Sequence, residues 1–314
     1  MSVRLGLLGA RGHTGRELIA LIAGHPGCEL VRAASSQQDG EPIATVVPEY
    51  HGALRFCSFT DEELFSTAVD AWILALPNGQ AQAWAARLIQ HHAPAVILDL
   101  SADHRLDPAW VFGLPEHHRA ALRGARRIAN PGCYATAALL ALWPWRQELT
   151  GVPRLFGVSG YSGAGASPSP RNDPARLADN LLPYQLTAHP HQSEIGREIG
   201  RDVVLVPHVA PFFRGLVVTA SFELAAPPDD EPVERYRASY RAEPLLEISP
   251  APAEPATLAG RPGAVIGGAQ ADPRDRRRLV VTVALDNLLK GAAVQAMQNL
   301  NLALGFEEGT GLGL

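Results

Sequence analysis

The chain has 314 residues, of which 46% are hydrophobic and 19% are charged, and its formal net charge at pH 7 is -5. This length and composition predict two globular domains and exclude an intrinsically disordered chain, while the mildly acidic balance gives no reason to expect nucleic acid or an anionic membrane as a partner. No apolar stretch approaches a membrane span, and the run at residues 1–8 is too short for a secretory signal, so a cytoplasmic location is predicted.

The first predicted elements are a strand, a glycine-rich loop and a helix. Residues 3–8 are almost entirely apolar, as in a buried parallel strand, and residues 16–23 have a helical pattern. Glycines between them permit a tight turn and the close approach of a pyrophosphate to the helix N-terminus. Such a loop alone fits a plain structural turn equally well, but its position between strand and helix predicts a dinucleotide site. The predicted cofactor contacts here are Gly9, Arg11, Gly12, His13, Thr14 and Gly15.

The residues after the second predicted strand, 29–34, bear on the identity of the cofactor. Folds that prefer NAD usually place a carboxylate there for the ribose 2′-hydroxyl. This chain has Ser35 and Ser36 instead, and its first acidic residue after the strand is Asp39. Together with Arg11 in the first loop, the two serines favour a 2′-phosphate, so NADP is the predicted cofactor.

Alternation of strands and helices continues with a strand at 71–76, a helix at 80–92 and a strand at 95–100. The first domain is therefore predicted to be a Rossmann-like, doubly wound parallel α/β domain, whose ligands bind at the carboxyl ends of the strands. Pro77 follows one of these strands and is a candidate cofactor contact. Arg105 follows another and is a candidate anchor for a substrate anion, with a surface salt bridge as the alternative.

Cys133 follows a tight turn and precedes a helix-prone run at residues 135–143. A helix N-terminus lowers the pKa of a thiol there and offers backbone N–H groups to an oxyanion, which makes Cys133 a candidate nucleophile. The alternative is a small buried apolar side chain. The three cysteines of the chain include no C-x-x-C pair, so neither a disulfide framework nor a metal site is predicted.

The second half predicts a second α/β domain built on a mixed sheet. Residues 167–174 are rich in proline and are either a lid or a connector, and the charged run at 274–278 is interpreted as a solvated turn. The predicted domains are residues 1–133, with residues 288–314 packing back on them, and residues 134–287 for catalysis and dimerisation. The predicted strands are residues 155–159, 203–206, 216–224 and 279–285, and a long helix is predicted at 292–304.

Several motifs, in this order along nearly the whole chain, resemble one family, the N-acetyl-gamma-glutamyl-phosphate reductases of arginine biosynthesis, which are relatives of aspartate-semialdehyde dehydrogenase. The motifs lie at residues 9–18, 99–106, 113–116, 130–136, 160–165, 207–208, 214–215 and 287–301. The resemblance implies a Rossmann-like cofactor domain, NADPH as cofactor, a small-molecule acyl phosphate as substrate, and a homodimer or homotetramer. It also implies that Cys133 is the nucleophile that carries a thioester intermediate.

Two histidines, His189 and His191, are candidates for the acid/base that serves this thiol. The family usually has an arginine between them, where this chain has Pro190. Because proline fixes its own φ and restricts the preceding residue, only one imidazole is expected to face Cys133. His191 is preferred, since Glu194 could orient its second nitrogen, and His189 is expected to line the substrate pocket.

The remaining site residues follow from the resemblance and from the chemistry of anions, to which a planar guanidinium donates two parallel hydrogen bonds. The cofactor contacts implied by the resemblance are Gly163 and Asn287, and the candidate substrate contacts are Arg105, Asn130, Tyr184 and Arg214. Ala166 is a second departure, because an arginine commonly follows Gly-Ala-Gly in the family. An aminoadipyl or aspartyl phosphate is an alternative substrate, and a non-catalytic NADP-binding regulator is the alternative from another class of protein.

Overall fold

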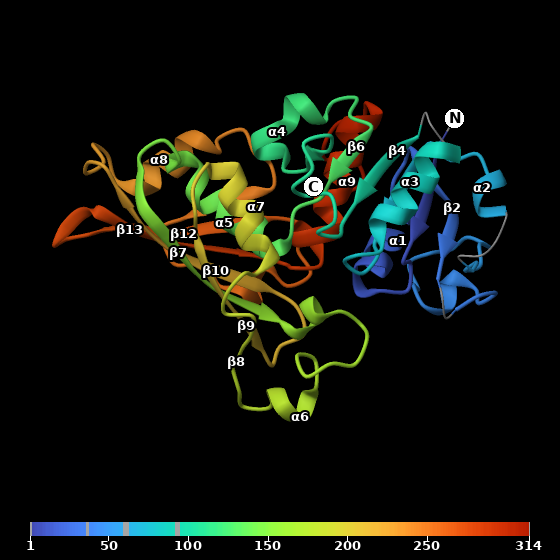
Figure 1. Cartoon of the computed structure of the whole chain (residues 1–314), viewed down its shortest axis with the longest axis horizontal. Coiled ribbons are helices and arrows are strands. Elements are labelled where there is room, and N and C mark those ends of the chain that lie inside the picture. Colours follow the sequence, from blue (N-terminus) through green and yellow to red (C-terminus); the bar gives the residue numbers. More distant parts are fainter. Residues whose placement is uncertain (1, 36–37, 59–62, 92–94, 314) are drawn as a thin grey trace. The chain divides into compact units, whose positions relative to one another are not determined.

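A computed structural model describes residues 2–35, 38–58, 63–91 and 95–313, and the chain divides into two compact units (Figure 1). The first unit comprises residues 1–131 and 292–314, and the second comprises residues 132–291. The expected boundaries, at residues 133 and 287, lie a few residues away. Cys133 therefore belongs to the second unit.

The first unit is a doubly wound parallel sheet, as predicted. Its strand order is β2-β1-β3-β4-β6-β5, and every neighbouring pair runs parallel. The strands are β1 Val3–Leu8, β2 Cys28–Ala34, β3 Ala71–Leu74, β4 Val96–Asp99, β5 Val111–Phe112 and β6 Arg127–Ala129. The helices are α1 His13–Ala23, α2 Glu63–Ser66, α3 Ala81–His91, α4 Pro115–Leu122 and α9 Val294–Leu304. Strand order reverses between β1 and β3, which is where such sheets bind ligands.

The C-terminal helix α9 packs against α1, α4 and β4 within the first unit. It begins after a π-helical turn, Leu289–Ala293, in which the Gly291 N–H donates to the carbonyl of Asp286 at 2.9 Å. The sequence pattern predicted one helix from residue 292, because a single wide turn does not change an apolar pattern enough to be recognised.

The second unit is built on a mixed sheet, also as predicted, with the order β11-β12-β13-β10-β7-β9-β8. The pairs β7–β9 and β11–β12 are parallel and the other pairs are antiparallel. The strands are β7 Leu149–Gly160, β8 Leu182–Pro183, β9 Val204–Ala210, β10 Leu216–Leu224, β11 Leu246–Ser249, β12 Ala264–Asp272 and β13 Asp275–Leu285. The helices are α5 Cys133–Leu142, α6 Pro174–Leu177, α7 Pro190–Ile199 and α8 Pro232–Ser239.

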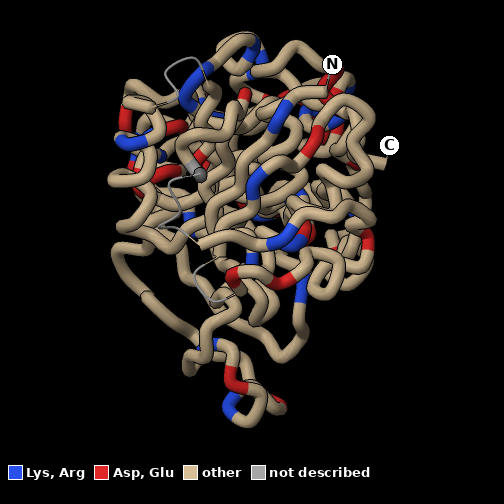
Figure 2. The backbone as a smooth tube through the Cα atoms, turned by 90° about the vertical axis from the view of Figure 1, so that its right-hand side faces the viewer, with Lys and Arg blue, Asp and Glu red and all other residues tan. Residues whose placement is uncertain are grey.

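Helix α5 is the core of this unit. Its residues after Cys133 are all buried, and it contacts α7, β10 and β13. Alternate residues of β7, such as Leu155 and Gly157, face this helical layer, whereas Phe156 points to the opposite face. The segment around α6 extends away from the sheet in both views, and Figure 2 shows basic and acidic positions on it.

One interpretation of the sequence is wrong. Residues 276–278 of the charged run form part of β13, which pairs with β12 in a hairpin, and the turn itself lies between Asp272 and Asp275. The arginines stay exposed at the end of the hairpin, where Arg277 pairs with Asp275 at 2.9 Å. The run of charged residues therefore indicates exposure to solvent, but it does not exclude a β-strand. Along the described ranges, no helix is long and apolar enough to cross a membrane.

Candidate active site

The glycine-rich loop joins β1 to α1 by close backbone contacts. Gly9 has φ +86°, and a Cβ on it would overlap the carbonyl oxygen of Ala75, so only glycine fits this turn. The N–H groups of Gly9 and Ala10 both donate to the carbonyl of Ala34 at 3.1 Å. A Cβ on Gly15 would lie 2.6 Å from the Ala10 oxygen. The loop therefore connects the carboxyl ends of three neighbouring strands and delivers the chain directly into α1.

The N-terminus of α1 has the properties of a phosphate site. Gly12 is the N-cap residue, and within the described part of the chain no side chain caps the helix. A Cβ built on Gly12 meets only the Gly9 oxygen, at 3.6 Å, so the space above this glycine is open. His13 and Thr14 occupy the first helical positions, where backbone N–H groups and the helix dipole favour an anion. Burial, with Arg16 nearby, lowers the pKa of His13. These residues fit the pyrophosphate of a dinucleotide.

The other predicted cofactor contacts of the first unit lie along the same edge of the sheet. Ser35 is buried after β2, and its N–H donates to the carbonyl of Cys57 at 2.9 Å. Arg11 is half-buried, and its carbonyl accepts from Arg16 Nε at 3.1 Å. Pro77 is exposed after β3. Ser36 lies outside the described residues.

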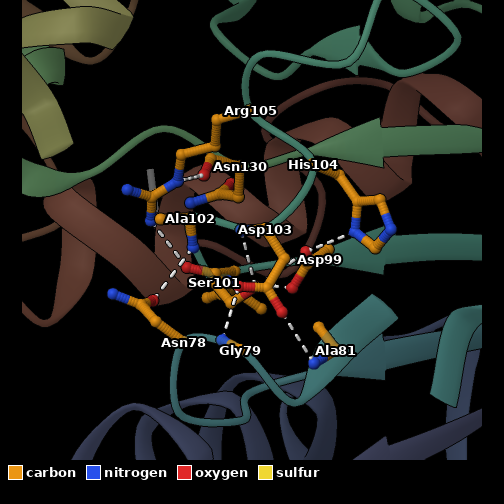
Figure 3. A network of polar contacts seen from close by, with 11 residues as sticks. Asn78, Gly79, Ala81, Asp99, Ser101, Ala102, Asp103, His104, Arg105 and Asn130 are labelled. Atoms are coloured by element: carbon orange, nitrogen blue, oxygen red, sulfur yellow. Dashed lines mark hydrogen bonds and ion pairs between the residues drawn. The ribbon is translucent and has the colours of Figure 1, made fainter. Parts of the chain in front are cut away.

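The loop after β4 is organised by the buried carboxylate of Asp99 (Figure 3). Its Oδ1 accepts the N–H of Ser101 and its Oδ2 accepts the Ser101 hydroxyl, both at 2.8 Å. Oδ2 also lies 2.7 Å from Nδ1 of His104, whose ring stacks on Trp110 with 3.9 Å between centroids. These contacts leave the loop little freedom.

Two further side chains tie this loop to the start of α3. Asp103 accepts the N–H groups of Gly79 at 2.6 Å and Ala81 at 2.9 Å, and Asn78 accepts the N–H of Ala102 at 3.0 Å (Figure 3). Both segments were predicted at strand ends from the sequence, but no role was predicted for Asn78 or Asp103. Polar side chains after consecutive parallel strands are the signal that could have linked them.

Arg105 is held in place by this network and is not a surface side chain. It is buried, with Nε donating to the carbonyl of Asn130 at 2.8 Å and a terminal nitrogen donating to the carbonyl of Leu100 at 2.6 Å. Asn130 is itself buried, and its side-chain oxygen accepts from Asn299 on α9 at 3.0 Å. Two predicted substrate residues thus meet in the first unit, where a fixed guanidinium suits an anion.

In the second unit, Cys133 is the first residue of α5, and helix α7 places two side chains on the glycine before it. A Cβ on Gly132 would overlap the imidazole of His191, so this ring lies directly against the Gly132 backbone. The buried carboxylate of Glu194 accepts the Gly132 N–H at 3.0 Å. Glu194, which was expected to orient His191, thus also holds the turn that carries the thiol.

A second glycine makes room for the thiol-bearing side chain. A Cβ on Gly291, in the π-helical turn, would lie 2.7 Å from the Cβ of Cys133. This role of Gly291 could not be predicted from the sequence, because no local pattern indicates a contact with a residue so far away along the chain. A π-turn often marks a functional position, and this one brings backbone close to the candidate nucleophile.

His189 and His191 lie side by side at the start of α7. His189 is the N-cap residue, and its Nδ1 accepts the His191 N–H at 3.3 Å, which leaves Nε2 to carry the proton of the neutral ring. The two rings are 4.6 Å apart and nearly perpendicular, at 81°. The ring centroid of Tyr184 lies 5.8 Å from that of His189. Burial, together with the nearby Cys133, raises the pKa of Tyr184 to about 12. Three predicted site residues therefore cluster near the thiol.

Tyr134, directly after the thiol, completes this cluster. Its ring centroid lies 6.1 Å from His189 and 6.0 Å from His191. Its hydroxyl donates to the carbonyl of His208 at 2.9 Å, and burial raises its pKa. A neutral, anchored tyrosine keeps the imidazoles in a mostly apolar setting.

Arg214, a predicted substrate contact, forms an ion pair with a buried carboxylate. Its Nε lies 2.5 Å from Oδ2 of the fully buried Asp286, which also accepts the Gly260 N–H at 2.6 Å. This ion pair fixes the loop between β9 and β10. The next residue, Asn287, adds two hydrogen bonds beside this ion pair. Its side chain accepts the Gly215 N–H at 2.8 Å and donates to the Ser162 hydroxyl at 2.9 Å, beside Gly163.

The other two thiols differ from Cys133 in their surroundings. Burial raises the pKa of Cys28 to about 11, so this thiol stays protonated at neutral pH. The thiol of Cys57 donates to the carbonyl of Ala33 at 3.6 Å. Over the ranges that the structure describes, no group of three His, Cys, Asp or Glu residues is arranged to hold a metal ion.

Comparison with known proteins gives the same division of the chain. Residues 4–125 match the family described as semialdehyde dehydrogenase, NAD binding domain, and residues 133–287 match semialdehyde dehydrogenase, dimerisation domain. The chain is 49% identical over 310 residues to the N-acetyl-gamma-glutamyl-phosphate reductase of Xanthomonas campestris pv. campestris (strain 8004), covering 98% of each. It is 48% identical over 309 residues to that of Stenotrophomonas maltophilia, covering 98% of this chain and 97% of the relative.

Solved structures show the same fold at low sequence identity. Aspartate semialdehyde dehydrogenase II from Vibrio cholerae matches with a TM-score of 0.79 at 19% identity, covering 97% of this chain and 99% of that one. Aspartate semialdehyde dehydrogenase with NADP from Candida albicans matches with a TM-score of 0.73 at 15% identity, with the same coverage. At these identities the likeness shows the fold alone.

Proposed function

Because the chain belongs to the family of N-acetyl-gamma-glutamyl-phosphate reductases, we propose that it reduces N-acetyl-gamma-glutamyl phosphate to N-acetylglutamate semialdehyde with NADPH and releases phosphate. One observation carries the chemical part of the proposal. The thiol of Cys133 begins a helix, and the His191 imidazole lies against the residue before it. A thiol beside an imidazole that can accept and return its proton is an arrangement suited to covalent catalysis.

In the proposed reaction Cys133 attacks the carbonyl carbon of the acyl phosphate. The C–S bond forms as the bond from carbon to the phosphate oxygen breaks, so phosphate leaves and a thioester remains. Bound NADPH would supply the hydride that reduces this thioester. When the aldehyde forms, the C–S bond breaks and the thiolate is regenerated on Cys133. Backbone N–H groups at the start of α5 would stabilise the oxyanion in both steps.

We assign the proton transfers to His191 and a substrate-lining role to His189. His191 lies on Gly132, whereas Nδ1 of His189 is used to cap α7. Only the ring that is not committed to the helix end is suited to take the thiol proton and return it. Tyr184 then lines the pocket beside His189.

The first unit would hold the cofactor. The open N-terminus of α1 supports binding of the pyrophosphate. Arg11 in the glycine-rich loop and Ser35 after β2 support preference for the 2′-phosphate of NADP. Gly163 and Asn287, from the second unit, are the proposed further cofactor contacts. Arg105 and Asn130 are the proposed contacts for a substrate anion.

We also propose that the enzyme is at least a homodimer, formed through the second unit. The sheet face opposite its helices exposes large apolar side chains, including Val152, Phe156 and Val280. Exposed apolar faces of this kind usually mark a protein interface. Phe156→Glu should shift the sedimentation coefficient towards that of the monomer, and an unchanged value would exclude this face. The reduced thiol that catalysis needs fits a reducing compartment such as the cytoplasm.

The proposed substrate is tested by a spectrophotometric assay run in reverse, with phosphate, NADP and a panel of semialdehydes. The panel contains N-acetylglutamate semialdehyde, the aminoadipate counterpart and aspartate semialdehyde. We expect the highest kcat/KM with the first. Preference for another semialdehyde would replace the substrate, and no turnover with any of them would leave an NADP-binding regulator as the better proposal.

A further inference from the structure

The loop that precedes α6, residues 165–173, is bridged by hydrogen bonds of the Asn172 side chain. The amide nitrogen of Asn172 donates to the carbonyls of Gly165 at 2.9 Å and Ser167 at 2.8 Å. Its side-chain oxygen accepts the N–H of Ser169 at 2.7 Å. Asp173 then caps α6 by accepting the N–H of Ala175 at 3.0 Å. The sequence did not decide whether this stretch is a lid or a connector. These hydrogen bonds order the loop and thereby fix the backbone around Arg171, which directly precedes Asn172.

Arg171 is a half-buried cation with an aromatic partner and no acidic one. Its guanidinium carbon lies 5.0 Å from the centre of the Tyr184 ring. Within the part of the chain that the structure describes, no carboxylate forms an ion pair with it. Arg171 also forms a side-chain hydrogen bond with Tyr184. Because a guanidinium has five N–H donors in one plane, it can still offer two parallel donors to a planar anion.

Contacts between rings connect Arg171 to the nucleophile. The ring centroids of Tyr184 and His189 are 5.8 Å apart, and those of His189 and His191 are 4.6 Å apart. The His191 ring in turn lies against Gly132, the residue before Cys133. All of these residues belong to the second unit. The arginine is thus placed at the far end of a short row of side chains that begins at the thiol.

The proposed substrate carries a second anion besides its acyl phosphate. Its α-carboxylate is separated from the reacting carbonyl by a short carbon chain, so a thioester on Cys133 would carry a carboxylate along this row. Arg214 of the same unit is paired with Asp286. The two positions where the family commonly has an arginine, 166 and 190, hold alanine and proline in this chain.

We propose that Arg171 is a specificity-determining residue that binds the α-carboxylate of the substrate through two parallel hydrogen bonds. This inference rests on the proposed function. It predicts that Arg171 selects acyl chains that end in a carboxylate and contributes to binding more than to the chemical step, because the anion is the same in ground state and transition state.

The test is Arg171→Gln in the reverse assay with N-acetylglutamate semialdehyde. We expect KM to rise about a hundredfold, because a charge-assisted bidentate contact is lost, with kcat changed less than about fivefold. Arg176→Gln is the matched control, because Arg176 is an exposed arginine on the neighbouring helix α6 and should leave both constants unchanged. The affinity for NADPH should also be unchanged.

A neutral substrate analogue separates carboxylate recognition from a structural effect. The α-methyl ester of the semialdehyde should be a poor substrate for the wild type, whereas Arg171→Gln should use ester and acid about equally well. If the wild type discriminates against the ester and the variant discriminates equally, or if the variant keeps the wild-type KM, Arg171 does not bind the carboxylate and the proposed function stands. A wild type inactive with the acid would overturn the proposed function and this inference together.

Discussion

Two helices of this chain begin in nearly the same way and differ in what lies above the first turn. Both α1 and α5 have glycine as the N-cap residue, with φ and ψ of -59° and 162° at Gly12 and -74° and 153° at Gly132. Above Gly12 the nearest atom to a built Cβ is 3.6 Å away, whereas above Gly132 the space is filled by His191. The same backbone geometry therefore leaves open space above the N-cap glycine in one unit and holds a histidine ring there in the other.

The absence of a side chain at the N-cap glycine has a different consequence in each helix. At α1 the glycine leaves room for a ligand, so the helix N–H groups can reach a phosphate. At α5 the glycine leaves room for a protein side chain, so an imidazole can lie beside the thiol. If this is correct, changes at α1 should act on cofactor affinity, and changes at α5 should act on kcat.

The largest effect should come from removing the imidazole at α5. His191→Asn should lower kcat by roughly 10²–10⁴-fold with a smaller change in KM, because a general base is lost. His189→Asn is the matched change, and asparagine can still cap α7, so the fold is retained. This variant should act mainly through KM. Steady-state kinetics on both variants decide the assignment, and the opposite pattern would exchange the two roles.

A smaller effect should follow from filling the space at each N-cap. Gly132→Ala should lower kcat by about 10²-fold, because its Cβ displaces the His191 ring from the thiol. Gly12→Ala should leave kcat nearly unchanged and raise the Kd for NADPH, since its Cβ enters the open phosphate site. Fluorescence titration with NADPH and initial rates measure the two quantities. Equal effects of both substitutions on kcat would contradict the distinction between the two helices.

The smallest effect should distinguish cofactors at the open site. Arg11→Ala should weaken NADPH binding by about 1–3 kcal/mol, because a charge-assisted contact to the 2′-phosphate is lost. Binding of NADH should be nearly unchanged, since it lacks that phosphate. Isothermal titration with both cofactors provides the measurement. An equal loss for the two would assign Arg11 to loop structure instead.

The two regions also differ in how far the sequence could predict them. The α1 site is made by one continuous segment, so strand, glycines and helix are visible together, and the parallel sheet follows from the alternation around them. Even the strand of residues 216–224 was predicted with its observed bounds, because its apolar run has a clear β pattern. Short strands such as β8 and β11 were missed, since a few residues carry too little pattern.

The α5 site is assembled from segments far apart in the chain, which sequence patterns cannot bring together. Cys133 and the histidines were identified from residue type and resemblance, but their contacts depend on packing. The carboxylate of Glu194 on the Gly132 N–H, the Gly291 backbone beside Cys133 and the pairing of Arg214 with Asp286 are all long-range. None leaves a local signal, so the structure was needed to place them.

The central claim, a thioester on Cys133, is tested most directly by mass spectrometry of the acylated enzyme. Incubation with N-acetylglutamate semialdehyde and NADP in the absence of phosphate lets the thiohemiacetal be oxidised but removes the acceptor that would release the acyl group. After acid quenching, we expect an N-acetylglutamyl adduct on the peptide that contains Cys133, NADPH formed in equal amount, and neither product in Cys133→Ser. Formation of NADPH without an adduct, or an adduct on Cys28 or Cys57, would contradict covalent catalysis at Cys133.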